Sequence, residues 1–135
     1  MDFYAPSLND GNSGDGHVVK EVQGDATTIR LEARRLDTIV AAAKCERLDL
    51  IKVDVEGFEW RVLRGGEDTI AKFRPHIVFE YNAEYAFRGG GTPEVVGDFF
   101  QKHGYRLFTI GRNWAEPIQR DRWPLSADIW AVPTN

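Results

Sequence analysis

The chain has 135 residues, of which 42% are hydrophobic and 28% charged, and its formal net charge is −4. These values are typical of one globular domain, and without a dense Lys/Arg cluster they argue against nucleic acid as a partner. No apolar run approaches the roughly 18 residues of a membrane-spanning helix. The polar start lacks a signal-peptide pattern, and Cys45 is the single cysteine. We therefore expect a cytoplasmic protein without a membrane partner.

The N-terminal segment, residues 1–26, is expected to be irregular. Residues 7–16 read SLNDGNSGDG, a concentration of the amino acids that favour turns. In residues 27–33 the apolar Ile29 and Leu31 alternate with polar neighbours, which predicts a half-buried strand. The folded domain is therefore expected to occupy residues 27–135.

The middle of the chain predicts alternating strands and helices. Asp37 is placed to cap a helix that ends near Arg47. The β-branched run at residues 48–55 is typical of an interior parallel strand. Two short helices should follow, separated by the glycine pair at residues 65–66, the second of them over residues 67–73.

A second buried strand is predicted over residues 76–81, followed by a flexible loop that ends in three glycines at residues 89–91. Thr92 and Pro93 should then begin a helix that stops at Gly104. Residues 105–110 and 128–132 are the final predicted strands. We expect an α/β fold with a doubly wound, mainly parallel sheet covered on both faces. The last two strands should form an antiparallel hairpin at one edge.

Carboxylates follow both of the predicted interior strands. In such sheets ligands bind beyond the carboxyl ends of the strands. Asp54 and Glu56 lie two residues apart and should point the same way, Gly57 allows a turn, and Glu80 ends the next strand. If the strands are neighbours, the three acids converge and at least one pKa rises. Such a group suits a general base or a cation site.

Each acid also has a structural interpretation. A carboxylate just past a strand is often the N-cap of the next helix, and this alternative is as good as a functional one for Glu56. Asp54 falls within an apolar run, where an unpaired carboxylate costs several kcal/mol, so a purely structural role is less favoured. For Glu80 a functional role is slightly favoured, because the following segment is expected to be a loop without a helix to cap.

Three segments together resemble the core signature of FkbM-type methyltransferases: IKVDVEGFE at residues 51–59, VLRGG at 62–66 and PHIVFE at 75–80. RLDTI at residues 35–39 resembles an element that precedes this core. The resemblance implies a Rossmann-like methyltransferase fold and the cofactor S-adenosylmethionine. It also implies methyl transfer to a hydroxyl of a small-molecule acceptor such as a sugar or secondary metabolite. By the same resemblance Asp54, Glu56 and Glu80 are the catalytic candidates, Asp54 also contacts the cofactor, and no metal ligand set is expected.

The chain departs from the family pattern at its start. Upstream of Ile29 there is no predicted strand followed by a glycine-rich turn that would hold the cofactor. We therefore expect a C-terminal portion of a methyltransferase domain with weak or undetectable cofactor affinity of its own. Two alternatives stay open: a non-catalytic remnant that self-associates through exposed sheet edges, and a metal-dependent sugar-nucleotide transferase in which Asp54 and Glu56 hold a divalent cation.

Overall fold

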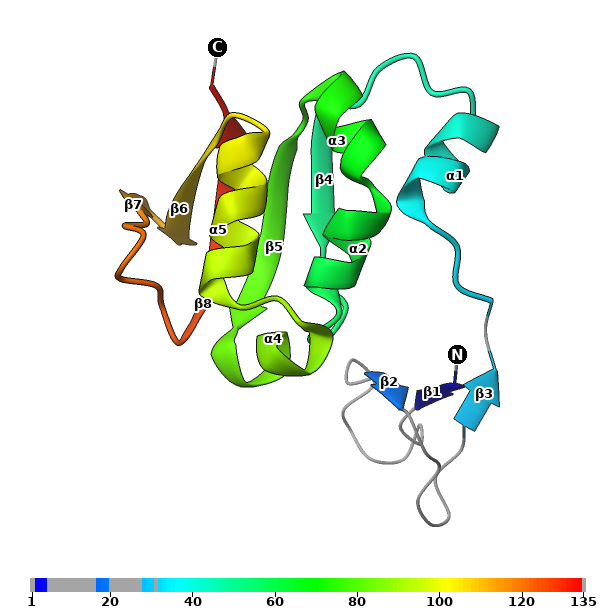
Figure 1. The fold of residues 1–135 in the computed structure, drawn as a ribbon, viewed down its shortest axis with the longest axis horizontal. Coiled ribbons are helices and arrows are strands. Elements are labelled where there is room, and N and C mark those ends of the chain that lie inside the picture. Colours follow the sequence, from blue (N-terminus) through cyan, green and yellow to red (C-terminus); the bar gives the residue numbers. More distant parts are fainter. Residues whose placement is uncertain (1, 5–16, 20–27, 31, 135) are drawn as a thin grey trace. The chain divides into compact units, whose positions relative to one another are not determined.

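The computed structural model describes residues 2–4, 17–19, 28–30 and 32–134 (Figure 1). Contacts divide the chain into two units, residues 1–34 and residues 35–135. The expected boundary between residues 26 and 27 thus stays a prediction, and the contact boundary follows Arg34. Among the described residues, no helix has the length and apolarity needed to cross a membrane.

The first unit contains a small antiparallel sheet in the order β2-β1-β3. Its strands are β1 (Asp2–Tyr4), β2 (His17–Val19) and β3 (Thr28–Arg30). β3 lies within the strand predicted for residues 27–33, whereas β1 and β2 lie in a segment that was expected to be irregular. The predicted turn-rich loop at residues 7–16 lies outside the described residues.

The second unit contains a five-stranded sheet in the order β4-β5-β8-β6-β7. Its strands are β4 (Leu50–Val53), β5 (His76–Asn82), β6 (Tyr105–Gly111), β7 (Trp114–Pro117) and β8 (Ser126–Pro133). β4 and β5 pair in parallel, while β8 runs antiparallel to β5 and β6, and β7 antiparallel to β6. The predicted mainly parallel sheet is therefore wrong for this unit, because β8 enters the sheet between β5 and β6 from the opposite direction.

The predicted antiparallel pairing of the last two strands is present as β6 and β8. It lies inside the sheet rather than at an edge. The two edges are β7 and β4, so the prediction of an interior strand at β4 is also wrong. The sequence did not predict β7, since all four of its residues are exposed and show no alternation of apolar and polar side chains. Proline is tolerated in such an edge strand, as Pro117 is here.

The helices of the second unit are α1 (Leu36–Ala42), α2 (Glu59–Gly65), α3 (Glu67–Phe73), α4 (Ala83–Gly89) and α5 (Pro93–Lys102). Three of them, α2, α3 and α5, lie on one face of the sheet, while α1 packs on α2 and α3, and α4 lies beyond the carboxyl ends of the strands (Figure 1). The β4-to-β5 and β5-to-β6 crossovers advance in the same direction across the sheet. Right-handed connections then put α2, α3 and α5 on the same side (Figure 1). Helices on both faces, as predicted, are not found within residues 35–134.

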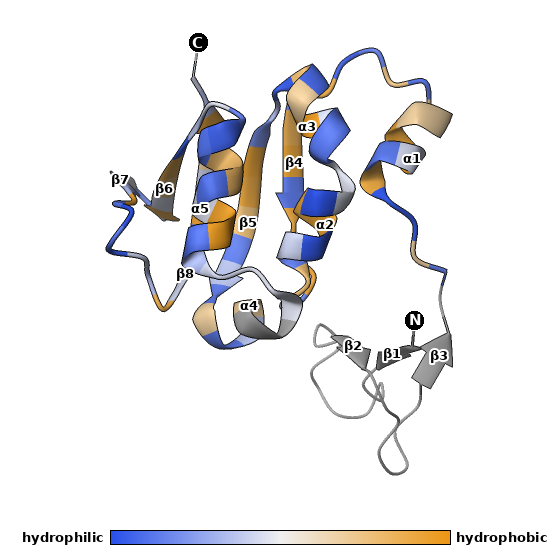
Figure 2. Ribbon diagram, viewed as in Figure 1, coloured by the Kyte–Doolittle hydropathy of each residue, from blue (hydrophilic) through white to orange (hydrophobic). Residues whose placement is uncertain are grey.

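The core lies between this helical layer and the sheet. β5 contributes the alternate residues Ile77, Phe79 and Tyr81, and the ring of Phe79 stacks on Phe100 of α5 at a centroid distance of 5.6 Å. In Figure 2, β4 and β5 are mainly hydrophobic, while α5 carries both hydrophobic and hydrophilic residues. The sequence predicted a buried strand over residues 76–81, whereas the buried residues of β5 alternate with half-buried ones. Burying each large apolar side chain contributes about 1.5–3 kcal/mol.

Asp37 has a different role from the predicted cap of its own helix. The N-cap position of α1 is Arg35, and the Asp37 carboxylate instead reaches the first turn of α3. Its Oδ1 accepts hydrogen bonds from the backbone N–H of Thr69 at 2.8 Å and from the Thr69 hydroxyl at 2.7 Å. Asp37 therefore satisfies donors at the start of α3, which would otherwise lack a partner within that helix.

We expect Asp37→Ala to lower the free energy of unfolding by about 1–3 kcal/mol, because buried donors of Thr69 lose their acceptor. Urea denaturation checks this, with the exposed neighbour Thr38→Ala as control at below about 0.5 kcal/mol. Burial raises the pKa of Asp37, but the hydrogen bonds from Thr69 and Arg35 outweigh it and hold the pKa below 3.8. The difference in free energy of unfolding between the unmodified chain and Asp37→Ala should therefore have its full size above that pH. It should disappear as the pH falls through the lowered pKa of Asp37. An equal loss in both variants would contradict the assignment.

Candidate active site

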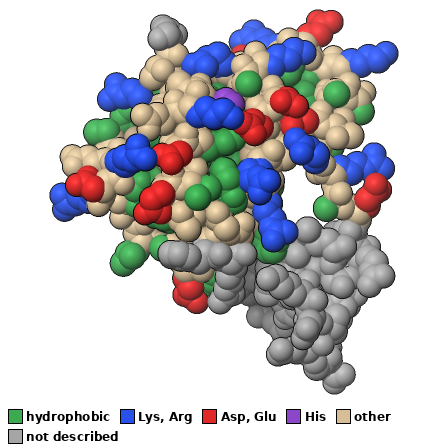
Figure 3. All heavy atoms as spheres, viewed as in Figure 1, with side chains coloured by type: hydrophobic (Ala, Val, Ile, Leu, Met, Phe, Trp, Pro, Cys, Tyr) green, Lys and Arg blue, Asp and Glu red, His purple; other side chains and the backbone are tan. Residues whose placement is uncertain are grey.

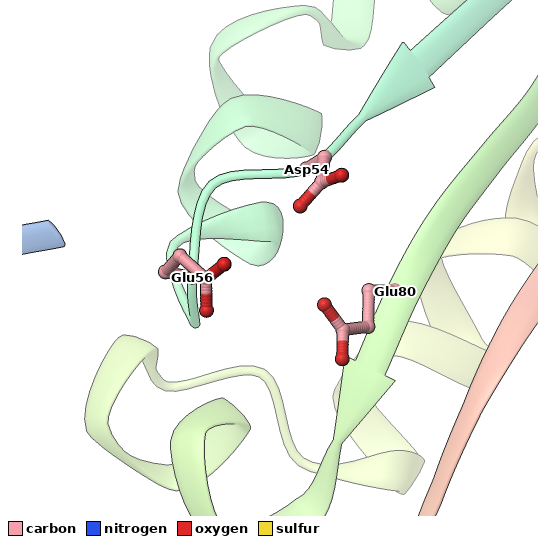
Figure 4. Close-up of side chains that lie close together, drawn as sticks. All are labelled: Asp54, Glu56 and Glu80. Carbon is pink, nitrogen blue, oxygen red and sulfur yellow. The ribbon is translucent and has the colours of Figure 1, made fainter. Parts of the chain in front are cut away.

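The acids predicted from the sequence meet at one edge of the sheet. The parallel register pairs Val53 of β4 with Phe79 of β5, which places the next residues, Asp54 and Glu80, level with each other. Figure 4 shows Asp54, Glu56 and Glu80 directed toward a common space. One carboxylate oxygen of each lies within 4.8 Å of the others. The structure therefore brings the three candidates together, at the carboxyl ends of two parallel strands.

A tight turn carries Glu56 back toward the sheet. Glu56 and Gly57 have φ angles of 51° and 94°, both in the left-handed region. A Cβ on Gly57 would approach the Cβ of Tyr85 to 2.7 Å, so both the backbone and the space require glycine. The motif residue Gly57 is thus the point at which the chain reverses and α4 packs closely.

Glu59 holds this turn from inside. It is 9% exposed, and its Oε1 accepts hydrogen bonds from the backbone N–H groups of Val55 at 3.1 Å and Gly57 at 3.2 Å. Backbone donors in such a buried turn need an acceptor, and a carboxylate makes the stronger, charge-assisted bonds. Glu59 therefore fixes the turn that positions Glu56.

The capping alternatives can be compared with the structure. α2 follows Phe58, and no side-chain cap bond is made there, while Glu56 points toward the other two acids (Figure 4). The prediction of a loop directly after β5 is wrong, because α4 begins at Ala83. Its first amides bond to Asn82, whose Oδ1 accepts from the N–H of Glu84 at 3.0 Å. Asn82 rather than Glu80 therefore caps α4, because a short polar side chain at the helix start can reach those donors.

The cluster holds more negative than positive charge. Lys52 Nζ lies 2.7 Å from Asp54 Oδ2, and this hydrogen bond together with the aspartate charge raises the pKa of Lys52. Burial raises the pKa of Glu80, and the charges of Glu56 and Asp54 raise it further. One ammonium faces three carboxylates, so the site favours either a proton on Glu80 or a cationic ligand.

A sequence model described as "Methyltransferase FkbM domain" matches residues 3–107. The chain belongs to the FkbM methyltransferase family. It is 31% identical over 107 residues to the AMB antimetabolite synthetase AmbE of Pseudomonas aeruginosa, a match that covers 73% of this chain and 5% of AmbE. It is 41% identical over 61 residues to the 2-O-methyltransferase NoeI of Sinorhizobium fredii, which covers 45% of this chain and 25% of NoeI. No solved structure matches the chain.

This FkbM domain also has a hollow along α5, which is larger than the space that Glu80 lines beside the acids. It has a volume of about 300 Å³ and is lined by α5, β6 and the connection between β7 and β8, including Trp123. The Trp123 ring also packs on Tyr81 at a centroid distance of 5.0 Å. Trp114 does not line this hollow and is 55% exposed.

On the face seen in Figure 3, Lys/Arg and Asp/Glu side chains are interspersed.

Sequence reasoning assigned no role to Glu59, although it belongs to the family segment DVEGFE. The available signal was an acid two residues after a glycine turn, at the first position of a helix. That spacing allows a carboxylate to reach back to the turn amides, as acidic residues do in capping motifs. In this FkbM domain Glu59 positions the acids rather than joining them.

We expect Glu59→Ala to lower the free energy of unfolding by about 1–3 kcal/mol, since it leaves two buried N–H groups without an acceptor. Glu59→Gln keeps a carbonyl oxygen at the same place and should lose less. Urea denaturation of both variants, with the exposed Glu116→Gln as control, measures the difference. Equal losses for Ala and Gln would show that the acceptor oxygen is not what stabilises the turn.

Proposed function

We propose that this chain supplies the catalytic carboxylates of an S-adenosylmethionine-dependent O-methyltransferase. The observation that carries the proposal is the meeting of Asp54, Glu56 and Glu80 within 4.8 Å at the carboxyl ends of two parallel strands in an FkbM chain. NoeI, to which the chain is similar, is named a 2-O-methyltransferase, which supports a hydroxyl acceptor. The matched segments span only 5% and 25% of the two relatives, so the activity of a whole protein is part of the proposal.

Glu80 is our candidate for the general base. A hydroxyl oxygen that attacks a methyl carbon must lose its proton, and a carboxylate with a raised pKa binds that proton more readily. Burial raises the pKa of Glu80, and its side chain points into the shared space (Figure 4). The Glu80 carboxylate would take up the proton of the acceptor hydroxyl, and S-adenosylmethionine, if bound beside it, would supply the methyl group.

Asp54 is our candidate for holding the cofactor. When bound, S-adenosylmethionine supplies a methyl group on a positively charged sulfur. The residues present fit such a group in charge, because three carboxylates face a single ammonium. Asp54 is more exposed than Glu80, so a ligand can reach its carboxylate directly. Glu56 adds negative charge beside it. The glycine-rich residues 11–16 lie outside the described residues and take no part in this assignment.

Radiolabelled methyl transfer from S-adenosylmethionine to a panel of hydroxylated sugars and metabolites tests the proposal. We expect Asp54→Asn and Glu80→Gln to lower the rate by at least about 100-fold, the usual contribution of a positioned acid–base group. Asp49→Asn is the matched control, because Asp49 lies at the other end of β4 in a surface pair with Arg47.

An Asp54→Asn variant as active as the Asp49→Asn control would contradict the proposal. Excess chelator should leave the rate unchanged. A complete loss with chelator and recovery with magnesium would favour the divalent-cation alternative, since carboxylate oxygens are the ligands that hard cations prefer.

A further inference from the structure

The hollow along α5 is formed by three segments of the second unit: α5, β6 and residues 117–123 (Figure 1). All of the residues that line it are described, and none of them lines the space beside the acids. The half-buried Leu107, Ile118 and Trp123 form its apolar wall. Its volume of about 300 Å³ lies at the lower end of the range for small-molecule sites, so it suits one small ring rather than a large ligand.

Gly97 lines this hollow from the middle of α5. Glycine is less favourable there than alanine, because it loses more backbone freedom when the helix forms. Neither the backbone nor the packing requires it. Gly97 is not among the glycines with a positive φ, and a Cβ would meet only Trp123 among the described residues, at an ordinary 3.5 Å. The missing side chain instead leaves space at the helix backbone, which is one use of glycine where a ligand approaches closely.

A row of planar polar side chains borders the hollow, and we call Asp98, Gln101 and Arg120 the polar row. The Arg120 guanidinium donates to Asp98 Oδ1 at 2.6 Å and to Gln101 Oε1 at 3.2 Å. Guanidinium, carboxylate and amide groups each carry two hydrogen-bonding atoms side by side, which matches two neighbouring hydroxyl groups of a ligand. Because the three side chains bind one another, part of their orientation is set before a ligand arrives.

The charged groups around the hollow already have partners. Asp98 is paired with Arg120. Hydrogen bonds from its own backbone N–H and from a neighbouring hydroxyl lower the pKa of Glu94 and hold its carboxylate at the start of α5. Arg106 points to the other side of β6 from Leu107, and its guanidinium lies near the ring of a second β6 residue at 5.3 Å from the centroid. No described lining residue therefore offers an unpaired cation to a phosphate or a carboxylate, so an uncharged ligand is favoured.

We propose that the hollow along α5 binds the ring of a neutral sugar. A sugar ring carries neighbouring hydroxyl groups for the polar row and C–H groups for the apolar wall, where Trp123 supplies an aromatic surface. A wholly apolar ligand would take the polar row out of water without replacing its hydrogen bonds. The proposal concerns binding alone, so it does not rest on the proposed methyl transfer.

An NMR titration of the full, isotope-labelled chain with the methyl glycosides of glucose, galactose and mannose tests the site. Concentrations up to about 50 mM are needed, because a single ring makes few contacts and binds in the millimolar range. The amide signal of Gly97 and the indole N–H signal of Trp123 should shift saturably with at least one glycoside. The indole signal of Trp114, which lies outside the hollow, should not shift. Glucuronate, a similar ring with a carboxylate, should bind more weakly than the methyl glucoside.

Gly97→Ala tests the role of the glycine directly. It should raise the urea midpoint, because alanine is the better helix former, and weaken glycoside binding by about 10-fold or more, because the new methyl group takes the space of the ring. Val95→Ala is the matched control. It also raises helix propensity, but Val95 is 39% exposed and does not line the hollow, so glycoside binding should be unchanged. Gln101→Ala removes one member of the polar row and should weaken binding several-fold.

Three results would overturn the proposal. The first is the absence of a saturable shift at Gly97 and Trp123 with every glycoside, for whatever reason. The second is a Gly97→Ala variant that binds a glycoside as tightly as the Val95→Ala control. The third is tighter binding of glucuronate than of the neutral glycosides, which would show that the hollow takes an anion.

Discussion

The parallel pairing of β4 with β5 is the constraint on which the candidate site depends. Its register sets Asp54 level with Glu80, so two carboxylates from distant parts of the sequence share one edge of the sheet. The turn after β4 then adds a third, because Glu59 binds the turn amides and Gly57 takes a conformation that other residues rarely adopt. Without the register the acids would be separate surface groups, and without the turn Glu56 would point elsewhere.

Gathering like charges opposes folding, and the surrounding contacts offset that cost in part. Lys52 pairs with Asp54, but Glu80 lies half-buried beside two further carboxylates. The pKa of Glu80 is raised because folding places the ionised side chain in a less favourable setting than water. A raised pKa of this kind is common where a protein needs a base or binds a cation, which is why we propose this edge as the site of methyl transfer. The core beneath it, centred on Phe79 and Phe100, is an ordinary apolar layer and supplies the rigidity.

The sequence predicted the local elements of the second unit better than their arrangement. The runs at β4 and β5, the glycine pair between α2 and α3, and the Thr92 and Pro93 start of α5 follow from local periodicity and capping, and all are present. The insertion of β8 between β5 and β6 depends on long-range pairing, which no local pattern reveals. β7 was missed because all four of its residues are exposed, and α4 because it is a single short helix begun by Asn82. The acids could be selected because they follow apolar strands, whereas Glu59 and Asp37 act on backbone groups of other segments and carry no visible periodic signal.

The most direct test of this account is the pKa of the Glu80 carboxyl group, followed by carbon-detected NMR during a pH titration. The account predicts a pKa above the ordinary 4.5, caused first by burial and then by the charges of Glu56 and Asp54. It also predicts that Asp54→Asn brings the value back toward 4.5, because one of the repelling charges is removed. A pKa at or below 4.5 that does not respond to Asp54→Asn would show that the three acids do not form one electrostatic site.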